Sequence, residues 1–360
     1  MPSAAERFLD IVRQASAQRA PLRVRGGGSK DFYGQAVQGE LLDTRSHAGI
    51  VAYDPTELVI TARCGTPLAE VESALAEKGQ MLAFEPPHFT PDPDGRSLAT
   101  FAGMIAAGLS GPRRAAAGAV RDYLLGVRIM DGRGRELVFG GQVMKNVAGY
   151  DIARMLAGTL GTLALIAEVS LKVLPRPATE LSLKLEMPLE RALETMNRWA
   201  GRPLPITASA WHDGELAVRL SGSEVALRSA REAIGGTALD APEAQAYWRA
   251  IREHTHPFFA GSEPLWRIAV PSAAGRLRVE GKTLIEWGGG LRWLRSAAGA
   301  GAVREVAREL EGHATLFRAA DKSAGAFMPL PAQLARLHRE LKDVFDPAGI
   351  LNPGRMYREL

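Results

Sequence analysis

The feature that most constrains the fold is a short basic segment with three consecutive glycines, RVRGGGSK at residues 23–30. It overlaps an apolar stretch at residues 22–24 that can form a strand. Glycine has no Cβ, so three in a row can turn with positive φ and direct several backbone N–H groups at one point. Such a group of donors binds anions, and Ser29 and Lys30 add a hydroxyl and a positive charge. From these residues alone, a pyrophosphate site and a flexible surface turn with a basic flank are equally good interpretations.

The segment differs from two common phosphate-binding loops. The P-loop spacing G-x-x-x-x-G-K-[ST] is absent from the chain. A Rossmann fingerprint, G-x-G-x-x-G, needs a third glycine where Asp31 stands. We therefore expect neither a P-loop protein nor a Rossmann dehydrogenase.

Composition narrows the class of protein. A chain of 360 residues is long enough for two domains, each with its own core. The net charge of +4 comes without a basic run or interleaved aromatic residues, so we expect no nucleic-acid partner. The sequence has no signal-peptide core and no run of about 20 apolar residues, which a membrane span requires. These features predict a cytoplasmic protein.

The residues that commonly bind metals or form disulfides are few and scattered. The single cysteine, Cys64, excludes an internal disulfide and cannot provide a metal framework alone. His254 and His256 are the only close pair of histidines, and no Cys, His or carboxylate cluster accompanies them. We interpret the pair as packing residues and expect no metal site.

Hydrophobic periodicity divides the chain near residues 175–177, where Pro-Arg-Pro is the clearest boundary. Before it, the pattern predicts helices over residues 3–15 and 66–78 and strands at 41–43, 50–53, 58–62, 123–130, 136–139 and within 158–174. After it, strands at 181–186, 206–211, 216–220, 266–270, 284–287 and 314–317 alternate with helices at 189–199, 224–234, 243–253 and 303–310. This order predicts an α+β unit over an antiparallel sheet, followed by a last helix at 331–345.

Two further segments are rich in small residues. In residues 100–114, small residues would let a helix start press closely on a flat ligand or on another backbone, and tight helix–sheet packing is the favoured interpretation. Residues 141–151 place polar groups among small residues, and Asp151 can cap a short helix that runs to Leu156. Residues 84–88, FEPPH, must form a shaped loop.

Taken in order, four segments resemble the FAD-linked oxidases with the vanillyl-alcohol-oxidase, or PCMH, type of FAD domain. They are RGGGSK at 25–30, T-x-A-G at 100–103, KNVAGYD at 145–151 and DPxxxLNPG at 346–354. Residues 84–88, 108–114 and 143–151 narrow the resemblance to the FAD-binding subunits of bacterial glycolate oxidases. The resemblance implies an α+β fold: a PCMH-type FAD-binding domain of two α/β lobes at 1–176, an α+β cap over an antiparallel sheet at 177–328, and a C-terminal helix and tail at 329–360 that return to the FAD site.

The resemblance also implies which residues contact FAD. The glycine segment would hold the pyrophosphate through backbone N–H groups, and the segment from residue 100 would form the second wall. Backbone groups of residues 161–166 would face the adenine, and Asn352 would lie close to the flavin ring. The implied cofactor-binding residues are Arg25, Gly26, Gly27, Gly28, Ser29, Lys30, Thr100, Ala102, Gly103, Met104, Ser110, Gly161, Ile166 and Asn352.

The sequence departs from its relatives at several positions. Gly28 stands where relatives with covalent flavin carry a histidine, so we expect non-covalent FAD. Ala102 replaces a common glycine, and Arg355 stands where related dehydrogenases usually have lysine. Replacing Gly27 by Val should abolish FAD binding, since a β-branched residue at φ > 0 is strained.

The catalytic residues cannot be assigned from the sequence. The segment H-x-G-D-G-N-x-H, which supplies metal ligands and a base in related catalytic subunits, is absent. His88 is the best candidate for a base. Cations for a substrate carboxylate could come from Arg113, Arg114, Arg121, Lys145, Arg267 or Arg318.

The resemblance therefore implies an FAD-binding subunit that oxidises glycolate, a 2-hydroxy acid, to glyoxylate together with a catalytic flavin subunit and an iron–sulfur subunit. The chain lacks the cysteines of an iron–sulfur cluster, so the electron acceptor must lie on another chain. Through those partners the complex could sit on the inner face of the cytoplasmic membrane. The alternatives are a self-sufficient FAD-dependent D-2-hydroxyacid dehydrogenase and a structural partner without flavin.

Overall fold

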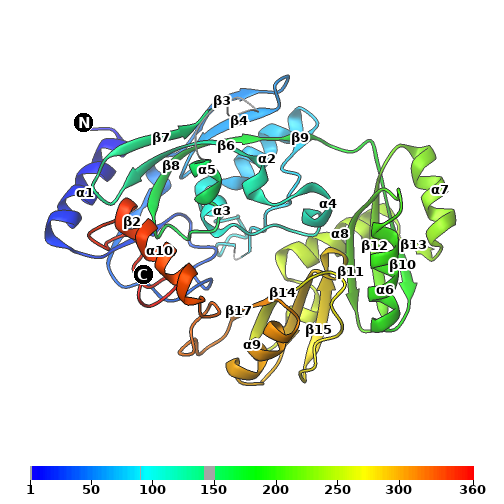
Figure 1. The fold of residues 1–360 in the computed structure, drawn as a ribbon. Coiled ribbons are helices and arrows are strands. Elements are labelled where there is room, and N and C mark those ends of the chain that lie inside the picture. Colours follow the sequence, from blue (N-terminus) through cyan, green and yellow to red (C-terminus); the bar gives the residue numbers. More distant parts are fainter. Residues whose placement is uncertain (1, 90, 142–150) are drawn as a thin grey trace.

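The computed structural model describes residues 2–89, 91–141 and 151–360. Most of the predicted segment at 141–151, including the candidate Lys145, lies outside the described residues. The chain forms two halves that lie side by side, each built on its own antiparallel sheet, and the C-terminal helix returns to the first half (Figure 1). The mixed helix-and-sheet architecture confirms the predicted fold class.

The N-terminal half combines a small parallel pair of strands with a larger antiparallel sheet. Helix α1 (Ala4–Gln18) starts with a capping box formed by Ser3 and Glu6, and leads into β1 (Leu22–Arg25), which pairs with β2 (Glu40–Asp43). The larger sheet has the order β3-β4-β8-β6-β7. Its strands are β3 (Ile50–Asp54), β4 (Val59–Arg63), β6 (Leu124–Asp131), β7 (Glu136–Gly140) and β8 (Ala164–Lys172). The flanking elements are α2 (Leu68–Glu77), β5 (Gln80–Met81), α3 (Phe101–Ala107), α4 (Arg114–Ala117), α5 (Ile152–Met155) and β9 (Leu174–Pro175).

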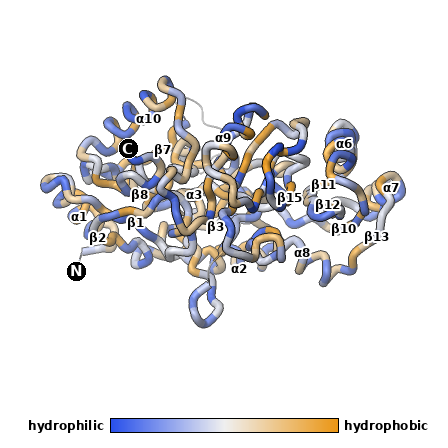
Figure 2. The backbone as a smooth tube through the Cα atoms, turned by 90° about the horizontal axis from the view of Figure 1, so that it is seen from below, coloured by the Kyte–Doolittle hydropathy of each residue, from blue (hydrophilic) through white to orange (hydrophobic). Residues whose placement is uncertain are grey.

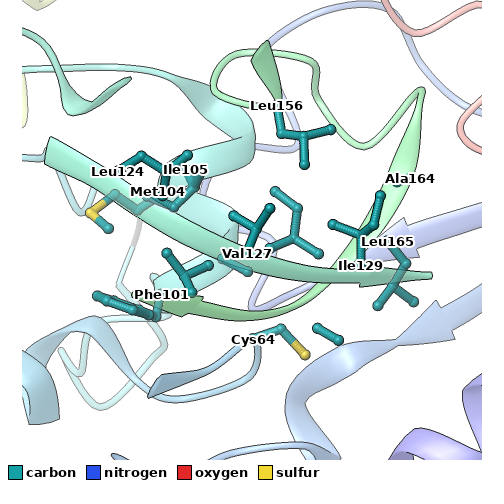
Figure 3. Close-up of a cluster of buried hydrophobic side chains, with 14 of the residues drawn as sticks. Cys64, Phe101, Met104, Ile105, Leu124, Val127, Ile129, Leu156, Ala164 and Leu165 are labelled. Atoms are coloured by element: carbon teal, nitrogen blue, oxygen red, sulfur yellow. The ribbon is translucent and has the colours of Figure 1, made fainter. Parts of the chain in front are cut away.

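Helix α3 packs against the middle of this larger sheet. Phe101, Met104 and Ile105 are buried in one apolar cluster with Val127 of β6 and Leu165 of β8 (Figure 3). The favoured interpretation of the small-residue segment, tight helix–sheet packing, is therefore confirmed.

The C-terminal half is an eight-stranded antiparallel sheet with the order β13-β10-β12-β11-β15-β16-β14-β17. Its strands are β10 (Thr179–Glu186), β11 (Ile206–His212), β12 (Glu215–Gly222), β13 (Thr237–Ala238), β14 (Leu265–Ala269), β15 (Lys282–Glu286), β16 (Leu291–Arg295) and β17 (His313–Arg318). Its helices are α6 (Leu189–Ala200), α7 (Glu224–Ile234), α8 (Ala241–Glu253) and α9 (Ala300–Glu309). The outer helices α6 and α7 alternate hydrophilic and hydrophobic stretches along the chain (Figure 2), as expected of helices that bury one side only.

The two faces of this sheet have different partners. Helices α6 and α7 pack on one face at one end, and α9 packs on the same sheet at the other end. The opposite face joins α8 and residues of the N-terminal half, including Tyr33, Leu109 and Leu160, in a single cluster. That face is therefore turned toward the N-terminal half.

Most predicted elements agree with the structure to within a few residues, but β16 was not predicted. Its sequence, LRWLR, reads as polar because it contains Arg292 and Arg295. Arg292 is nevertheless fully buried, and its guanidinium donates to the carbonyls of Gly289, Gly275 and Ala274. Pairing with backbone carbonyls makes a buried arginine possible where periodicity predicts none.

The chain from α10 (Ala332–Phe345) onward, here called the tail, lies beside β1 and β2 (Figure 1). Leu351 forms a parallel bridge to Leu22, and the Leu22 N–H donates to the Ile350 carbonyl at 2.7 Å. The tail thus extends the β1–β2 pair at the end of the glycine segment. No helix within the described residues is long and apolar enough to cross a membrane.

Candidate functional site

A cleft of about 710 Å³ opens where the glycine segment, the start of α3, the turn before β8 and the tail meet. The lining residues are Val24, Arg25, Gly26, Gly27, Gly28, Ser29, Lys30, Asp31, Thr44, Thr100, Ala102, Gly103, Ala106, Ala107, Leu160, Gly161, Ala164, Ile166, Asn352 and Arg355.

The three glycines are needed for two different reasons. A Cβ on Gly26 would overlap the Thr100 hydroxyl, and a Cβ on Gly27 would overlap the Leu98 carbonyl. Gly28 has φ +81° and is the only one of the three in the left-handed region. The expectation that Gly27 needs a positive φ is therefore wrong, because close approach to the chain before α3 is what excludes a side chain there.

The cleft wall is positively charged. Burial lowers the pKa of Lys30 to about 8, although the charge of Glu253 opposes the shift. Arg25 forms an ion pair with Asp31 at 2.6 Å. Burial likewise lowers the pKa of Arg355, against the charge of Asp31. Three cations and one carboxylate therefore surround the cleft, a balance that suits an anionic guest.

Arg355 carries a polar atom that is not satisfied by the protein. Its guanidinium donates to the carbonyls of Lys30 at 3.3 Å and Tyr33 at 3.4 Å. Its Nε is buried and has no partner among the described residues. Because a buried N–H without an acceptor costs free energy, this atom suggests a missing acceptor at the cleft.

Asn352 uses its amide to hold the wall of the cleft together. Its Oδ1 accepts from the Val24 N–H at 2.8 Å, and its Nδ2 donates to the Leu160 carbonyl at 2.7 Å. Its own N–H donates to the Leu22 carbonyl at 3.0 Å. The amide thus joins the tail, β1 and the turn before Gly161. A Cβ on Gly161 would approach Asn352 Nδ2 to 2.9 Å, which explains the glycine there.

Twelve of the fourteen predicted cofactor-binding residues line this cleft. The side chain of Met104 is instead buried in the apolar core, with 1% exposed. The Ser110 hydroxyl accepts from the Val120 N–H at 3.3 Å, beyond the C-terminal end of α3. Helical spacing explains the position of Met104, because it faces the sheet one turn after Phe101.

Sequence reasoning missed seven lining residues: Val24, Asp31, Thr44, Ala106, Ala107, Leu160 and Arg355. Asp31 directly follows the glycine segment, and Ala106 and Ala107 continue α3, so extending each motif would have found them. Thr44 follows β2, and its hydroxyl donates to the Arg25 carbonyl at 3.2 Å. No local pattern marks Thr44 or Leu160, since the fold alone brings them to the cleft.

The structure does not bring His88 to the cleft. Its Nδ1 lies 2.5 Å from the Ser97 hydroxyl and its Nε2 lies 2.9 Å from Glu72 Oε2. Its backbone N–H donates to Glu253 at 2.9 Å. Both ring nitrogens are therefore engaged within the protein, and His88 fixes the 84–88 loop instead of serving as a base at this site.

His254 and His256 are packing residues, as predicted. The His254 ring stacks on Phe259 with 4.0 Å between centroids, and His256 Nδ1 accepts from the Phe258 N–H at 3.2 Å. Burial lowers the pKa of both rings, most strongly that of His254. Within the described ranges, no group of three or more His, Cys, Asp or Glu side chains could hold a metal ion.

The candidate cations fall into three groups. Arg113 is buried and pairs with Glu85 and Glu180. Arg121 is exposed and pairs with Asp122.

Arg318 packs over the rings of Phe32 and Phe89. Arg114 and Arg267 form the third group, since they flank Trp287 without a carboxylate partner among the described residues. Among the candidates in the described residues, this pair forms no ion pair and no hydrogen bond.

Comparisons with known proteins agree with this geometry. Residues 1–140 match the model of the FAD binding domain, and residues 328–356 match that of the C-terminal domain of FAD linked oxidases. Glycolate oxidase subunit GlcE of Escherichia coli is 48% identical over 98% of this chain and 97% of its own length. Glycolate oxidase subunit GlcD of Bacillus subtilis is 30% identical over 48% of this chain and 36% of its own.

A solved structure confirms the fold at much lower identity. The 4-ethylphenol oxidase from Gulosibacter chungangensis superposes with a TM-score of 0.69 over 99% of this chain and 88% of its own, at 15% identity. At that identity the likeness supports the fold alone.

Proposed function

The chain belongs to the family of glycolate oxidase subunit GlcE, within the FAD-linked oxidases, and we propose that it is the FAD-binding subunit of a glycolate oxidase complex. The observation that carries the proposal is the cleft, where the two matched segments meet: residues 24–31 come from the first, and Asn352 and Arg355 come from the second. A cofactor that contacts both segments would explain why the two segments line the same cleft.

The residues present fit FAD. Gly26, Gly27 and Gly28 line the cleft, and we propose that their backbone N–H groups hold the pyrophosphate. The buried, unpartnered Nε of Arg355 would find an acceptor in the same group. Gly28 has no side chain through which flavin could be attached, which supports non-covalent FAD.

The remaining predicted contacts extend the same proposal. Backbone groups from Gly161 to Ile166 would face the adenine, and Asn352 would fix the cleft wall near the flavin. The bound flavin would carry electrons within the complex, and the residues of this chain would bind and orient that flavin.

Partners are part of the proposal. Among the described residues no histidine lines the cleft, and Cys64 is the sole cysteine of the sequence and is buried. These features support a catalytic flavin subunit that oxidises the 2-hydroxy acid and an iron–sulfur subunit that takes up the electrons. A location in the cytoplasm, on the inner face of the membrane through those partners, follows from the same assignment.

We also propose the predicted division into residues 1–176, 177–328 and 329–360. Strand β9 ends the N-terminal half at Pro175, and β10 begins the second sheet at Thr179. The third part returns to the first through the Leu22–Leu351 bridge.

The visible spectrum of the purified chain tests the function. With added FAD it should show an oxidised flavin band that persists when glycolate or D-lactate is added without oxygen, and that bleaches once the partner subunits are present. Rapid bleaching of the chain alone would instead identify a self-sufficient 2-hydroxyacid dehydrogenase. A chain that takes up no FAD would contradict the proposal.

A further inference from the structure

Two arginines from different halves of the molecule flank one tryptophan ring. Arg114 is the first residue of α4, and its guanidinium carbon lies 4.3 Å from the centroid of Trp287. Arg267 lies in β14, 5.2 Å from the same centroid. Both side chains are partly buried and still reach solvent.

Neither guanidinium is held in an ion pair by the described residues, although the charges of Asp122 and Glu286 act on Arg114 and Arg267 from a distance. Within the described ranges, Arg114 and Arg267 form no ion pair and no hydrogen bond. The carboxylate of Asp122 is shared between Arg121 and the Ala119 N–H.

The other nearby acid, Glu286, is held by the Trp293 indole N–H at 2.7 Å. Burial and then the charge of Arg267 lower the pKa of Arg114, so the two cations repel each other. Two like charges held together in this way favour an anion between them.

The turn that carries Trp287 has an unusual backbone conformation that fixes the position of the ring. Trp287 has φ +56°, a conformation that is strained for a residue with a side chain, and Gly288 and Gly289 follow with φ +65° and +102°. The Gly288 N–H donates to Ser209 Oγ at 2.9 Å, which fixes the turn. The Trp287 indole donates to the Gly111 carbonyl at 3.0 Å, so the ring is anchored to the N-terminal half.

The pair is connected to the cleft through the apolar cluster between the two halves. Trp287 belongs to the same apolar cluster as Ala107 and Leu160, which line the cleft. Arg267 is close enough to Tyr33 for its charge to act on that phenol, and the Tyr33 N–H donates to the Lys30 carbonyl at 2.9 Å. Arg267 therefore reaches toward the glycine segment from the opposite half.

We propose that Arg114 and Arg267 form a subsite that binds the carboxylate of a small 2-hydroxy acid or of its 2-oxo product. The planar guanidinium offers paired N–H donors that match a carboxylate, and both guanidinium groups lie against the same Trp287 ring. Only the substrate class rests on the proposed function. The subsite itself rests on the two unpaired cations.

Calorimetric titration of the full-length, FAD-loaded chain with glycolate and with oxalate tests the subsite. The wild-type chain should bind both, and Arg114→Gln and Arg267→Gln should each weaken binding about tenfold or more, the effect expected from losing a charged hydrogen bond. Arg308→Gln is the matched control, since Arg308 is exposed on α9 and pairs with Glu305. It should bind as the wild type does.

The result that would overturn the subsite is a wild-type chain with full flavin content that binds neither anion, or glutamine variants that bind as tightly as wild type. Failure to take up FAD would count against the proposed function alone, because the same titration on the flavin-free chain still tests the two arginines. If a glutamine variant does not fold, Arg267→Lys replaces it. Lysine keeps the positive charge but lacks the paired N–H donors of the guanidinium, so carboxylate binding should still weaken.

Discussion

Single residues at the cleft contribute shape and charge in addition to the hydrogen bonds of Asn352. Gly27 illustrates shape, because its backbone lies against the Leu98 carbonyl and leaves no room for a Cβ. Lys30 illustrates charge, because burial moves its pKa close to neutrality. Each property gives a prediction.

We predict that Gly27→Ala is enough to abolish FAD uptake. The added methyl group must displace either the glycine segment or the chain before α3, so the N–H groups no longer converge. Flavin absorbance after gel filtration measures the loss. Gly299→Ala is the control, since a Cβ there meets nothing within 4 Å. Normal flavin content in the Gly27 variant would show that the segment does not bind FAD.

Lys30 predicts how FAD affinity depends on pH. Its pKa of about 8 in the free protein means that it is charged below that pH and neutral above it, so affinity should fall as the pH rises from about 7 to about 10. Lys30→Gln should remove most of this dependence and match the high-pH affinity, whereas substitution of the exposed Lys78 should leave the wild-type profile. Fluorescence titration with FAD at each pH provides the measurement. A flat wild-type profile would argue against a charged contact from Lys30.

Glu286 predicts a pH dependence of stability. Burial raises its pKa to about 7, although the Trp293 indole and the charge of Arg267 oppose the shift. A raised carboxyl pKa means that the folded state holds the proton more tightly, so this contribution to stability is present at low pH and is lost as the pH rises through 7.

Glu286→Gln cannot ionise and still accepts from Trp293, so relative to it the wild-type free energy of unfolding should fall by about 2 to 3 kcal/mol between about pH 5 and pH 8. Urea unfolding of both proteins at the two pH values gives the difference. Parallel behaviour of the two proteins would mean that Glu286 titrates normally.

At the scale of elements, the tail is held by one buried ion pair. Lys342 of α10 lies 2.7 Å from Asp346, and its ammonium also donates to the carbonyls of Thr162 and Leu351. Asp346 in turn accepts from the N–H groups of Ile350 and Leu351. Asp346 thereby positions the chain that ends at Asn352, which explains its place in the D-P-x-x-x-L-N-P-G segment.

We predict that Asp346→Asn destabilises the protein by about 3 kcal/mol, because it leaves the buried Lys342 without its counter-charge. FAD binding should weaken as well, since the tail forms one wall of the cleft. The matched control is Glu340→Gln on the same helix, whose exposed pair with Arg336 should contribute less than about 1 kcal/mol. Equal effects of the two variants on chemical denaturation would contradict this role of Asp346.

The sequence predicts elements and motifs better than it predicts how they meet. The glycine segment around Gly28 could be predicted, because a run of glycines in the sequence directly indicates a special backbone conformation. Strand β16 was missed because Arg292 satisfies its charge with carbonyls that are distant in sequence. The strained turn at Trp287 was missed too, although Gly288 to Gly290 repeat the three-glycine pattern. Arg355 was noted from the sequence only as a difference from relatives and not as a site residue. Its contact with Lys30 depends on the tail, which returns to the N-terminal half.

At the scale of the whole molecule, the two halves are joined by a half-buried group of charges. Glu85, in the loop at 84–88, pairs with Arg113 of the N-terminal half at 3.5 Å and with Arg219 of β12 at 2.8 Å. Burial raises the pKa of Glu85, but the charges of Arg219 and Arg113 outweigh it, so the carboxylate stays ionised. The group lies on the face of the second sheet that is turned toward the N-terminal half, so it fixes how that sheet packs on this half.

Glu85→Gln tests whether this bridge couples the halves. The substitution leaves Arg113 and Arg219 largely buried with only the half-exposed Glu180 as a counter-charge, so we expect a loss of about 3 kcal/mol. Because the lost pair spans both halves, the melting curve in calorimetry should broaden or split, while FAD added before heating restores part of the lost stability. Glu136→Gln, which removes an exposed pair with Arg128 inside one hairpin, should melt as one transition close to that of the wild type. If Glu85→Gln also melts in a single unchanged transition, the halves are held together by the apolar cluster around Trp287 rather than by these charges.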